Sequence, residues 1–125
     1  MIDQLRALIT KHCATLGREM DEINLSLTKL QCAGDQCSLV AQEAAGKAHK
    51  VKGSSGTIGF KQISQSAADL ELYLRQLGEQ PGPLTNEQEK KIELLFGRLR
   101  ILVEGATPEQ SSLYDAQIPF FANKN

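Results

Sequence analysis

The chain has 125 residues, with 14 Lys and Arg against 15 Asp and Glu, and a formal net charge of -1. A single domain is expected at this length. The charge balance argues against nucleic acid as a partner, because nucleic-acid binders normally carry a clear basic excess. No apolar run approaches the roughly 20 residues that span a bilayer. Met1 to Thr10 also lack the pattern of a signal peptide. We therefore expect a cytoplasmic protein without a membrane partner.

The composition favours helices. Aromatic residues make up 5% of the chain and Trp is absent, whereas Leu, Ala, Gln, Glu and Lys are abundant. These abundant residues are good helix formers, and an all-β core normally carries more aromatic and β-branched residues. The chain has 3 cysteines, an odd number without a secretion signal, so reduced thiols are the simplest interpretation.

The N-terminal third predicts two helical stretches. Apolar residues recur at three- and four-residue spacing, which predicts an amphipathic helix over about 2–17. Gly17 is expected to end or kink this helix. The same period continues from Met20 and predicts a second stretch over about 21–32. The chain therefore has more helical structure at its N-terminus than a minimal bundle needs.

A break at 33–35 separates these stretches from the next helix. Ser38 is a candidate N-cap for that helix, and Asp35 is the earlier alternative. The helix is expected to continue to Ile58, with Gly59 at the position of a C-terminal glycine.

Two further helices follow. One is predicted over about 61–77, and the Gly- and Pro-rich segment 78–83 is the clearest loop in the chain. Thr85 is expected to cap the last long helix, with Gln88 completing a capping box and Gly105 ending the helix.

These elements predict an all-α fold, an antiparallel up-down four-helix bundle with an extra N-terminal helical segment. We assign the bundle domain to residues 1–106 and a C-terminal tail, a short helix or an extended segment, to residues 107–125. Thr107 and Pro108 are suited to start a short helix in this tail. The sequence does not place residues 118–125.

The segment around His49 has an unusual composition. On a helix of about 100° per residue, His49 lies opposite the apolar stripe. Its nearest surface neighbours are then Gln42, Ala45, Gly46, Lys52, Gly53 and Gly56. Glycines inside a helix are costly, and the three near His49 would together cost on the order of 2 kcal/mol relative to alanine. We interpret them as leaving room for another protein to approach the imidazole ring.

An exposed histidine beside a cation is suited to accepting a phosphoryl group. Neutral imidazole is a good nitrogen nucleophile at physiological pH, because the reference pKa of histidine is about 6.5. Lys52 lies one turn beyond His49, where a positive charge would favour an anionic group on the ring. The sequence has no carboxylate cluster for a metal and no nucleotide-binding loop, so the catalytic groups are expected to come from a partner.

The motif resembles that of the histidine-containing phosphotransfer (HPt) domain family. The matching residues are His49-x-Val51-Lys52-Gly53-Ser54-Ser55, then Ile58-Gly59-Phe60, and then Ile63, Ala67 and Leu70-Glu71. The resemblance covers about residues 48–71 directly, and the bundle pattern extends it over most of the chain.

The resemblance implies a role for each motif residue. His49 would be phosphorylated on its outer ring nitrogen, and Lys52 would stabilise the phosphoryl group. Glu71 would bond the other ring nitrogen and fix the tautomer. Gly53 would keep the surface clear, in a docking face that we extend to Gly46, Lys50 and Gly56.

The resemblance also implies the partners, which are a response-regulator receiver domain and a sensor histidine kinase. We expect a monomeric phosphocarrier in a phosphorelay, with no cofactor and no ATP site of its own, and with magnesium only in the receiver. The alternative is a non-catalytic helical adaptor that binds the same partners.

Other residues receive plainer interpretations. Lys61 and Arg75 are interpreted as solvated charges, which a partner would still be able to reach. Lys47 lies close to the core side of its helix, so it either snorkels or the helix bends near Gly46. His12-Cys13 and the pair Cys32 and Cys37 fit no common zinc spacing, so we expect core or boundary positions for these residues and no metal site.

Overall fold

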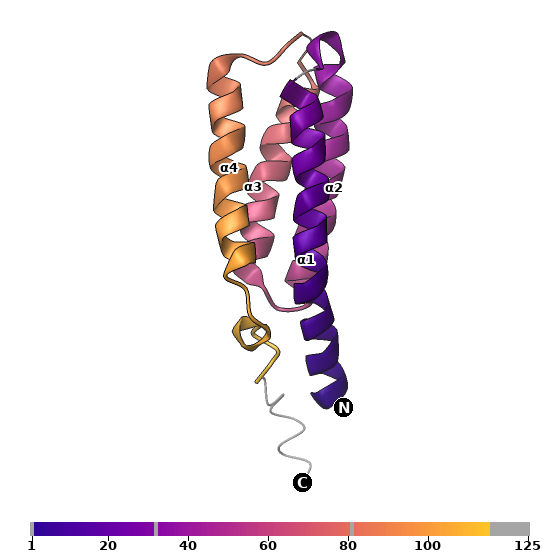
Figure 1. The fold of residues 1–125 in the computed structure, drawn as a ribbon, viewed down its shortest axis with the longest axis vertical. Coiled ribbons are helices and arrows are strands. Elements are labelled where there is room, and N and C mark those ends of the chain that lie inside the picture. The colour runs from indigo at the N-terminus through magenta and orange to yellow at the C-terminus, as the bar shows by residue number, and fades with distance from the viewer. Residues whose placement is uncertain (1, 32, 81, 116–125) are drawn as a thin grey trace.

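The structure is a computed structural model that describes residues 2–31, 33–80 and 82–115. In these ranges the elements are α1 (Ile2–Gln31), the 3₁₀ turn η1 (Gly34–Gln36), α2 (Cys37–Thr57), α3 (Lys61–Gly78), α4 (Asn86–Glu104) and the 3₁₀ turn η2 (Pro108–Gln110). Figure 1 shows the four helices running alternately up and down, with the start of α1 extending past the others. The predicted all-α antiparallel bundle is confirmed.

Helix α1 is continuous, so the prediction of two separate stretches was wrong. Gly17 neither ends nor interrupts the helix, which runs over Ile2–Gln31. The physical reason is the buried stripe, which passes Gly17 in phase from Leu16 to Met20 and Ile23. Packing along this stripe outweighs the cost of one helical glycine, about 1 kcal/mol. The extra N-terminal segment is therefore the first part of α1 itself, and the predicted end at Cys32 lies outside the described residues.

The start of α2 also differs from expectation. The helix begins at Cys37 directly after η1, and no side chain caps it. Ser38 donates its hydroxyl proton to the carbonyl of Gly78, the last residue of α3, and Gln42 Nε2 donates to the same oxygen at 3.3 Å. Ser38 therefore ties the start of α2 to the end of α3, and Gly78 belongs to α3 rather than to the loop predicted there.

Helices α2 and α3 form the centre of the core. Helix α2 contributes four fully buried alanines to the core, at positions 41, 44, 45 and 48, and α3 contributes the fully buried Leu70 and Leu74. Small side chains allow the two helices to approach closely. Ala45 was predicted to be a surface neighbour of His49, and this was wrong, because α2 is covered on two sides by α1 and α3.

The ends of the last two helices follow the sequence closely. Thr85 accepts the Gln88 amide and forms the predicted capping box, and Gly105 is the C-cap of α4. Between α2 and α3, Gly59 has a φ of 96°. A Cβ there would also stand 2.7 Å from Ser111 Oγ. This turn therefore requires glycine for both its backbone and its packing.

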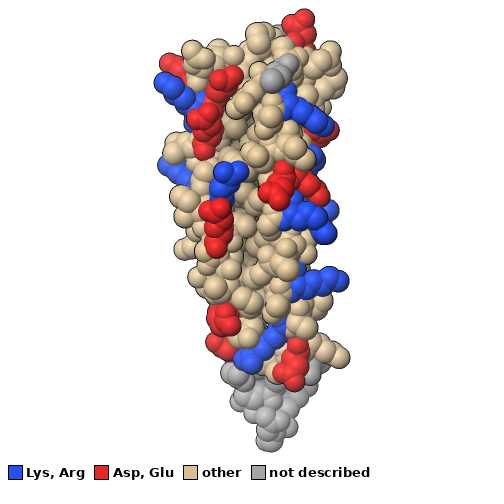
Figure 2. Space-filling model, in the orientation of Figure 1, with Lys and Arg blue, Asp and Glu red and all other residues tan. Residues whose placement is uncertain are grey.

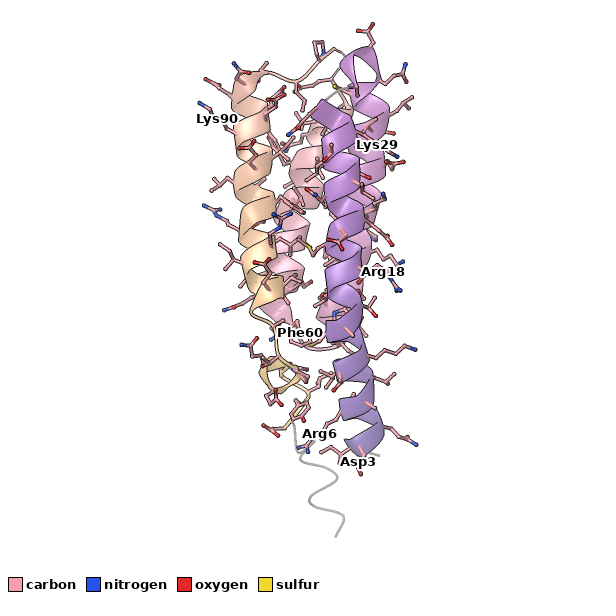
Figure 3. All side chains as sticks on the ribbon, viewed as in Figure 1. Asp3, Arg6, Arg18, Lys29, Phe60 and Lys90 are labelled. Carbon is pink, nitrogen blue, oxygen red and sulfur yellow. The ribbon has the colours of Figure 1, made fainter. Side chains whose placement is uncertain are left out.

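The C-terminal segment packs on the base of the bundle as far as residue 115. Ser111 Oγ donates to the carbonyl of Ile58 at 2.6 Å, and Ser112 N donates to that of Gly59 at 3.0 Å. Arg6 of α1, labelled in Figure 3, donates to Tyr114 O at 3.0 Å and lies over the Tyr114 ring. The predicted short helix after Thr107 is the turn η2. The boundary at residue 106 stays a prediction, and residues 118–125 lie outside the described part.

The surface carries mixed charge. In the view of Figure 2, Lys and Arg are interspersed with Asp and Glu over the described residues. No helix in the described ranges has an apolar stretch of the length and hydropathy needed to cross a membrane.

Candidate functional site

His49 stands on the open side of α2 and is oriented from α3. Its side chain is 58% exposed, and its Nδ1 lies 3.0 Å from Glu71 Oε2. Because an ionised carboxylate only accepts hydrogen bonds, we assign the proton to Nδ1. That assignment leaves the lone pair on Nε2, which is the tautomer a nucleophilic imidazole needs.

Glu71 contacts His49, Lys52 and Arg75 through its carboxylate. Its side chain is only 9% exposed. Lys52 Nζ lies 2.9 Å from Oε1. Arg75 donates to Oε2 from Nε and Nη2, both at 2.8 Å. Burial raises the pKa of Glu71, but the hydrogen bonds from Lys52, Arg75 and His49 outweigh it and hold the pKa below its usual value of 4.5. The carboxylate is therefore ionised at neutral pH and available to His49.

Arg75 is the part of the site that the sequence interpretation missed. It was interpreted as a solvated charge, and its side chain is 49% exposed, but its guanidinium binds the buried carboxylate. The available signal was its position four residues after Glu71, since oppositely charged residues at this spacing face each other on a helix. Sequence spacing does not reveal that the carboxylate is buried, which is what makes the contact significant.

The glycines around His49 divide into two kinds. A Cβ added at Gly46 or Gly53 would meet nothing within 4 Å, so both leave open space beside the ring. A Cβ at Gly56 would lie 3.0 Å from Ser64 Oγ of α3. Gly56 is exposed, and it also allows α2 and α3 to approach each other. Its role in docking, like that of Lys50, stays a prediction.

Lys47 bridges from α2 to α1 and its ammonium reaches the buried Ser26. Its Nζ donates to Ser26 Oγ at 2.7 Å and to the carbonyl of Glu22 at 3.2 Å, both on α1. Ser26 in turn donates to Glu43 at 2.9 Å. Helix α2 is continuous past Gly46. Of the two predicted alternatives, the long Lys47 side chain therefore extends to polar groups of α1.

A groove between α1 and α2 continues from Gly53. Its volume is about 560 Å³, and it is lined by Leu8, Lys11, His12, Thr15 and Glu19 of α1 and by Lys50, Gly53, Ser54, Thr57 and Ile58 of α2. The groove begins one helical turn from His49, so a protein that docks on His49 can also reach into it.

His12 closes one side of this groove. Its Nε2 lies 3.1 Å from Ser55 Oγ, and its ring stacks on Phe60. Burial lowers the pKa of His12 below 6.5, so the ring is neutral at physiological pH. Figure 3 places Phe60 at the turn between α2 and α3. The sequence interpretation favoured a core or boundary position for His12 over a metal ligand, but it did not identify Ser55 and Phe60 as the partners.

The described cysteines have packing roles. Cys37 is buried, with Sγ 3.6 Å from the carbonyl of Leu30, and Cys13 is half-buried on α1. Cys32 lies outside the described residues. Over the described ranges, no group of three or more His, Cys, Asp and Glu side chains is placed to hold a metal ion.

The fold and the site define a class of protein. The bundle presents an exposed imidazole that is oriented through Nδ1 by a carboxylate on the neighbouring helix, and this arrangement leaves Nε2 accessible. The family model of the Hpt domain matches residues 2–104, so the chain belongs to the Hpt domain family. Comparisons with curated proteins and with solved structures returned no match. Hpt domains are phosphocarrier modules for histidine phosphotransfer in two-component signalling, and they interact with receiver and kinase domains.

Proposed function

We propose that His49 is the phosphorylated residue and that the protein passes a phosphoryl group between receiver aspartates in a phosphorelay, or accepts it from a hybrid sensor kinase. The observation that carries this proposal is the contact of 3.0 Å between His49 Nδ1 and Glu71 on an otherwise exposed ring. This contact orients the ring and leaves the Nε2 lone pair for the incoming phosphorus atom.

In the proposed transfer, one bond to phosphorus forms, one breaks, and no proton leaves the site. The Nε2 lone pair of His49 attacks the phosphorus of a receiver aspartyl phosphate, and the bond from phosphorus to the carboxylate oxygen breaks. The electron pair of that bond leaves with the aspartate. The ring becomes a phosphorylated imidazolium that keeps its Nδ1 proton, and its positive charge faces the Glu71 carboxylate at 3.0 Å. The reverse sequence delivers the group to the next receiver.

Lys52 supplies the positive charge next to the incoming group. Its ammonium lies in the same cluster as His49, bound to Glu71 Oε1 at 2.9 Å, and it is 35% exposed. Phosphoryl transfer depends mainly on positioning and on charge stabilisation. A flexible ammonium in the same cluster fits the second need, while magnesium and the remaining catalytic groups belong to the partner.

The docking face in this proposal comprises Gly46, Lys50, Gly53 and Gly56 with the adjoining groove. Open space at Gly46 and Gly53 lets a partner's backbone come close to the ring. The receiver and the kinase are alternative occupants of this face. A monomeric state, a cytoplasmic location and the lack of an ATP site remain predictions from the sequence.

The test is incubation of the purified protein with a phosphorylated receiver. We expect acid-labile, base-stable phosphate to appear on the protein and to map to His49. His49→Gln should lose the phosphate and still bind the receiver. The chain has 2 histidines, so His12→Gln is a matched control that should keep it. Label on the His49→Gln variant would refute the assignment, and receiver binding by the wild type without any label would favour the adaptor.

A further inference from the structure

The two oxygens of the Glu71 carboxylate have different partners. Oε1 has Lys52 Nζ at 2.9 Å. Oε2 receives His49 Nδ1 at 3.0 Å. The same oxygen is 2.8 Å from both Nε and Nη2 of Arg75. The lysine and the arginine therefore act on different oxygens, and either one can leave without displacing the other.

Phosphorylation changes the charges around this carboxylate. Before transfer, one carboxylate and two permanent cations leave the cluster with one net positive charge. A phosphoryl group on His49 brings two negative charges, and the ring gains one positive charge. Its oxygens then compete with Glu71 for the ammonium of Lys52, because ionised donors bind most strongly to ionised acceptors.

Lys52 can leave Glu71 for the phosphoryl oxygens only if another cation stays bound to Glu71. The lysine has a flexible stem and a compact charge, whereas the arginine has a planar, rigid set of donors and remains protonated. A carboxylate that is only 9% exposed would be costly to leave without a counter-charge. Arg75 reaches Glu71 from the same helix, four residues on, and holds Oε2 through two donors.

We propose that Arg75 is a positioning residue that holds and neutralises Glu71, so that Lys52 can turn from Glu71 to the phosphoryl group on His49. Arg75 acts through Glu71 and does not itself bind the phosphoryl group. This inference rests on the proposed function of His49, and it assigns different roles to Lys52 and Arg75.

The test uses a small donor, so that docking does not contribute. Phosphoramidate transfers its phosphoryl group directly to an imidazole nitrogen and releases ammonia, which requires that the phosphoramidate nitrogen is protonated. The rate of His49 phosphorylation is therefore followed near pH 8, above the reference histidine pKa of about 6.5. Arg75→Gln should slow the reaction about tenfold, the size of one charge-assisted contact. Arg75→Lys should recover most of this loss. Lys61→Gln removes a charge from the exposed start of α3, and this control should have no effect.

The Glu71→Gln background separates a positioning role from a structural one. This variant has no carboxylate for Arg75 to hold, so Arg75→Gln should cost less than about twofold in it. An undiminished tenfold loss in the Glu71→Gln background would overturn the proposal, and so would a wild-type rate in Arg75→Gln.

Folding and function are checked separately. Thermal unfolding of every variant shows whether a slow rate reflects a damaged bundle, and Arg75→Lys, which keeps the charge, guards against that outcome. If the wild type takes no phosphate from either a receiver or phosphoramidate, the proposed function fails and the inference fails with it. If the wild type is labelled and only the Arg75 pattern is wrong, the function stands and the inference alone is refuted.

Discussion

Gly56 of α2 faces Ser64 of α3 so closely that a Cβ on the glycine would lie 3.0 Å from the serine Oγ. The same serine donates to the carbonyl of Lys52 at 2.8 Å. Gly53, one turn earlier, has nothing within 4 Å of its Cβ position. Two glycines of one motif therefore serve different purposes: Gly56 brings α3 and its Glu71 close to α2, and Gly53 leaves the surface open.

Gly53→Leu should separate docking from chemistry. A leucine there would occupy open space beside His49, so the bundle should fold and gain about 0.5–1 kcal/mol from the better helix former. Phosphoryl transfer from a receiver should fall by about tenfold or more, because a leucine blocks close approach of a protein surface. Labelling by phosphoramidate should stay normal. Normal transfer from the receiver would contradict the role given to Gly53.

Gly56→Leu should instead damage the fold. The larger side chain has to displace Ser64 or push α3 away, and overpacking of this kind typically costs about 1–3 kcal/mol. Urea unfolding measures this cost directly, with Gly53→Leu as the matched control on the same helix. Equal stability of the two variants would show that Gly56 has no packing role.

The helices after residue 36 and the exposed position of His49 were predictable from the sequence because their signals are local. The capping box at Thr85 and the motif around His49 each depend on residues within a few positions of one another. The orientation of Glu71 towards His49 was predicted only through the family resemblance, since it depends on how α2 and α3 pack.

The errors came from packing that spacing alone does not encode. Ala45 was assigned to the surface because a single apolar stripe was assumed, whereas α2 is buried against two neighbours. Gly17 was given a local role that a continuous buried stripe overrides. Arg75 was taken as solvated because its charge was visible in the sequence and the burial of its partner was not.

Acid should weaken the bundle partly through Glu71. Burial raises the pKa of this carboxyl, but the hydrogen bonds from Lys52, Arg75 and His49 bring it below 4.5 in the folded protein. The unfolded state therefore takes up a proton first as the pH falls. The stability from Glu71 is fully present above about pH 4.5 and is lost as the pH falls through the lower, folded pKa.

The measurement is the free energy of unfolding in urea between about pH 3 and pH 7. Glu71→Gln should flatten the acid limb of this profile, while Glu93→Gln, at an exposed position of α4, should leave the profile unchanged. An acid limb in Glu71→Gln as steep as that of the wild type would mean that the cluster does not hold the carboxylate ionised.

His12 should cause a second loss of stability on acidification, and this loss should begin at a higher pH than the loss due to Glu71. Burial lowers the pKa of this imidazole below 6.5. The contribution of His12 is therefore fully present above about pH 6.5 and is lost as the pH falls below it, because the unfolded chain binds the proton more readily. The charges that line the same groove are Lys11, Glu19 and Lys50. Two of these are cations that oppose a charged ring, and burial raises the pKa of the third, Glu19.

NMR titration of the 2 histidines should therefore show His12 taking up its proton below pH 6.5. Replacing His12 by Gln, which keeps a polar group near Ser55, should reduce the pH dependence of unfolding between about pH 5 and pH 7, within the limit of about 1.4 kcal/mol per pH unit for one proton. A His12 ring that titrates above pH 6.5 would mean that it is not held in the neutral form against Ser55 and Phe60.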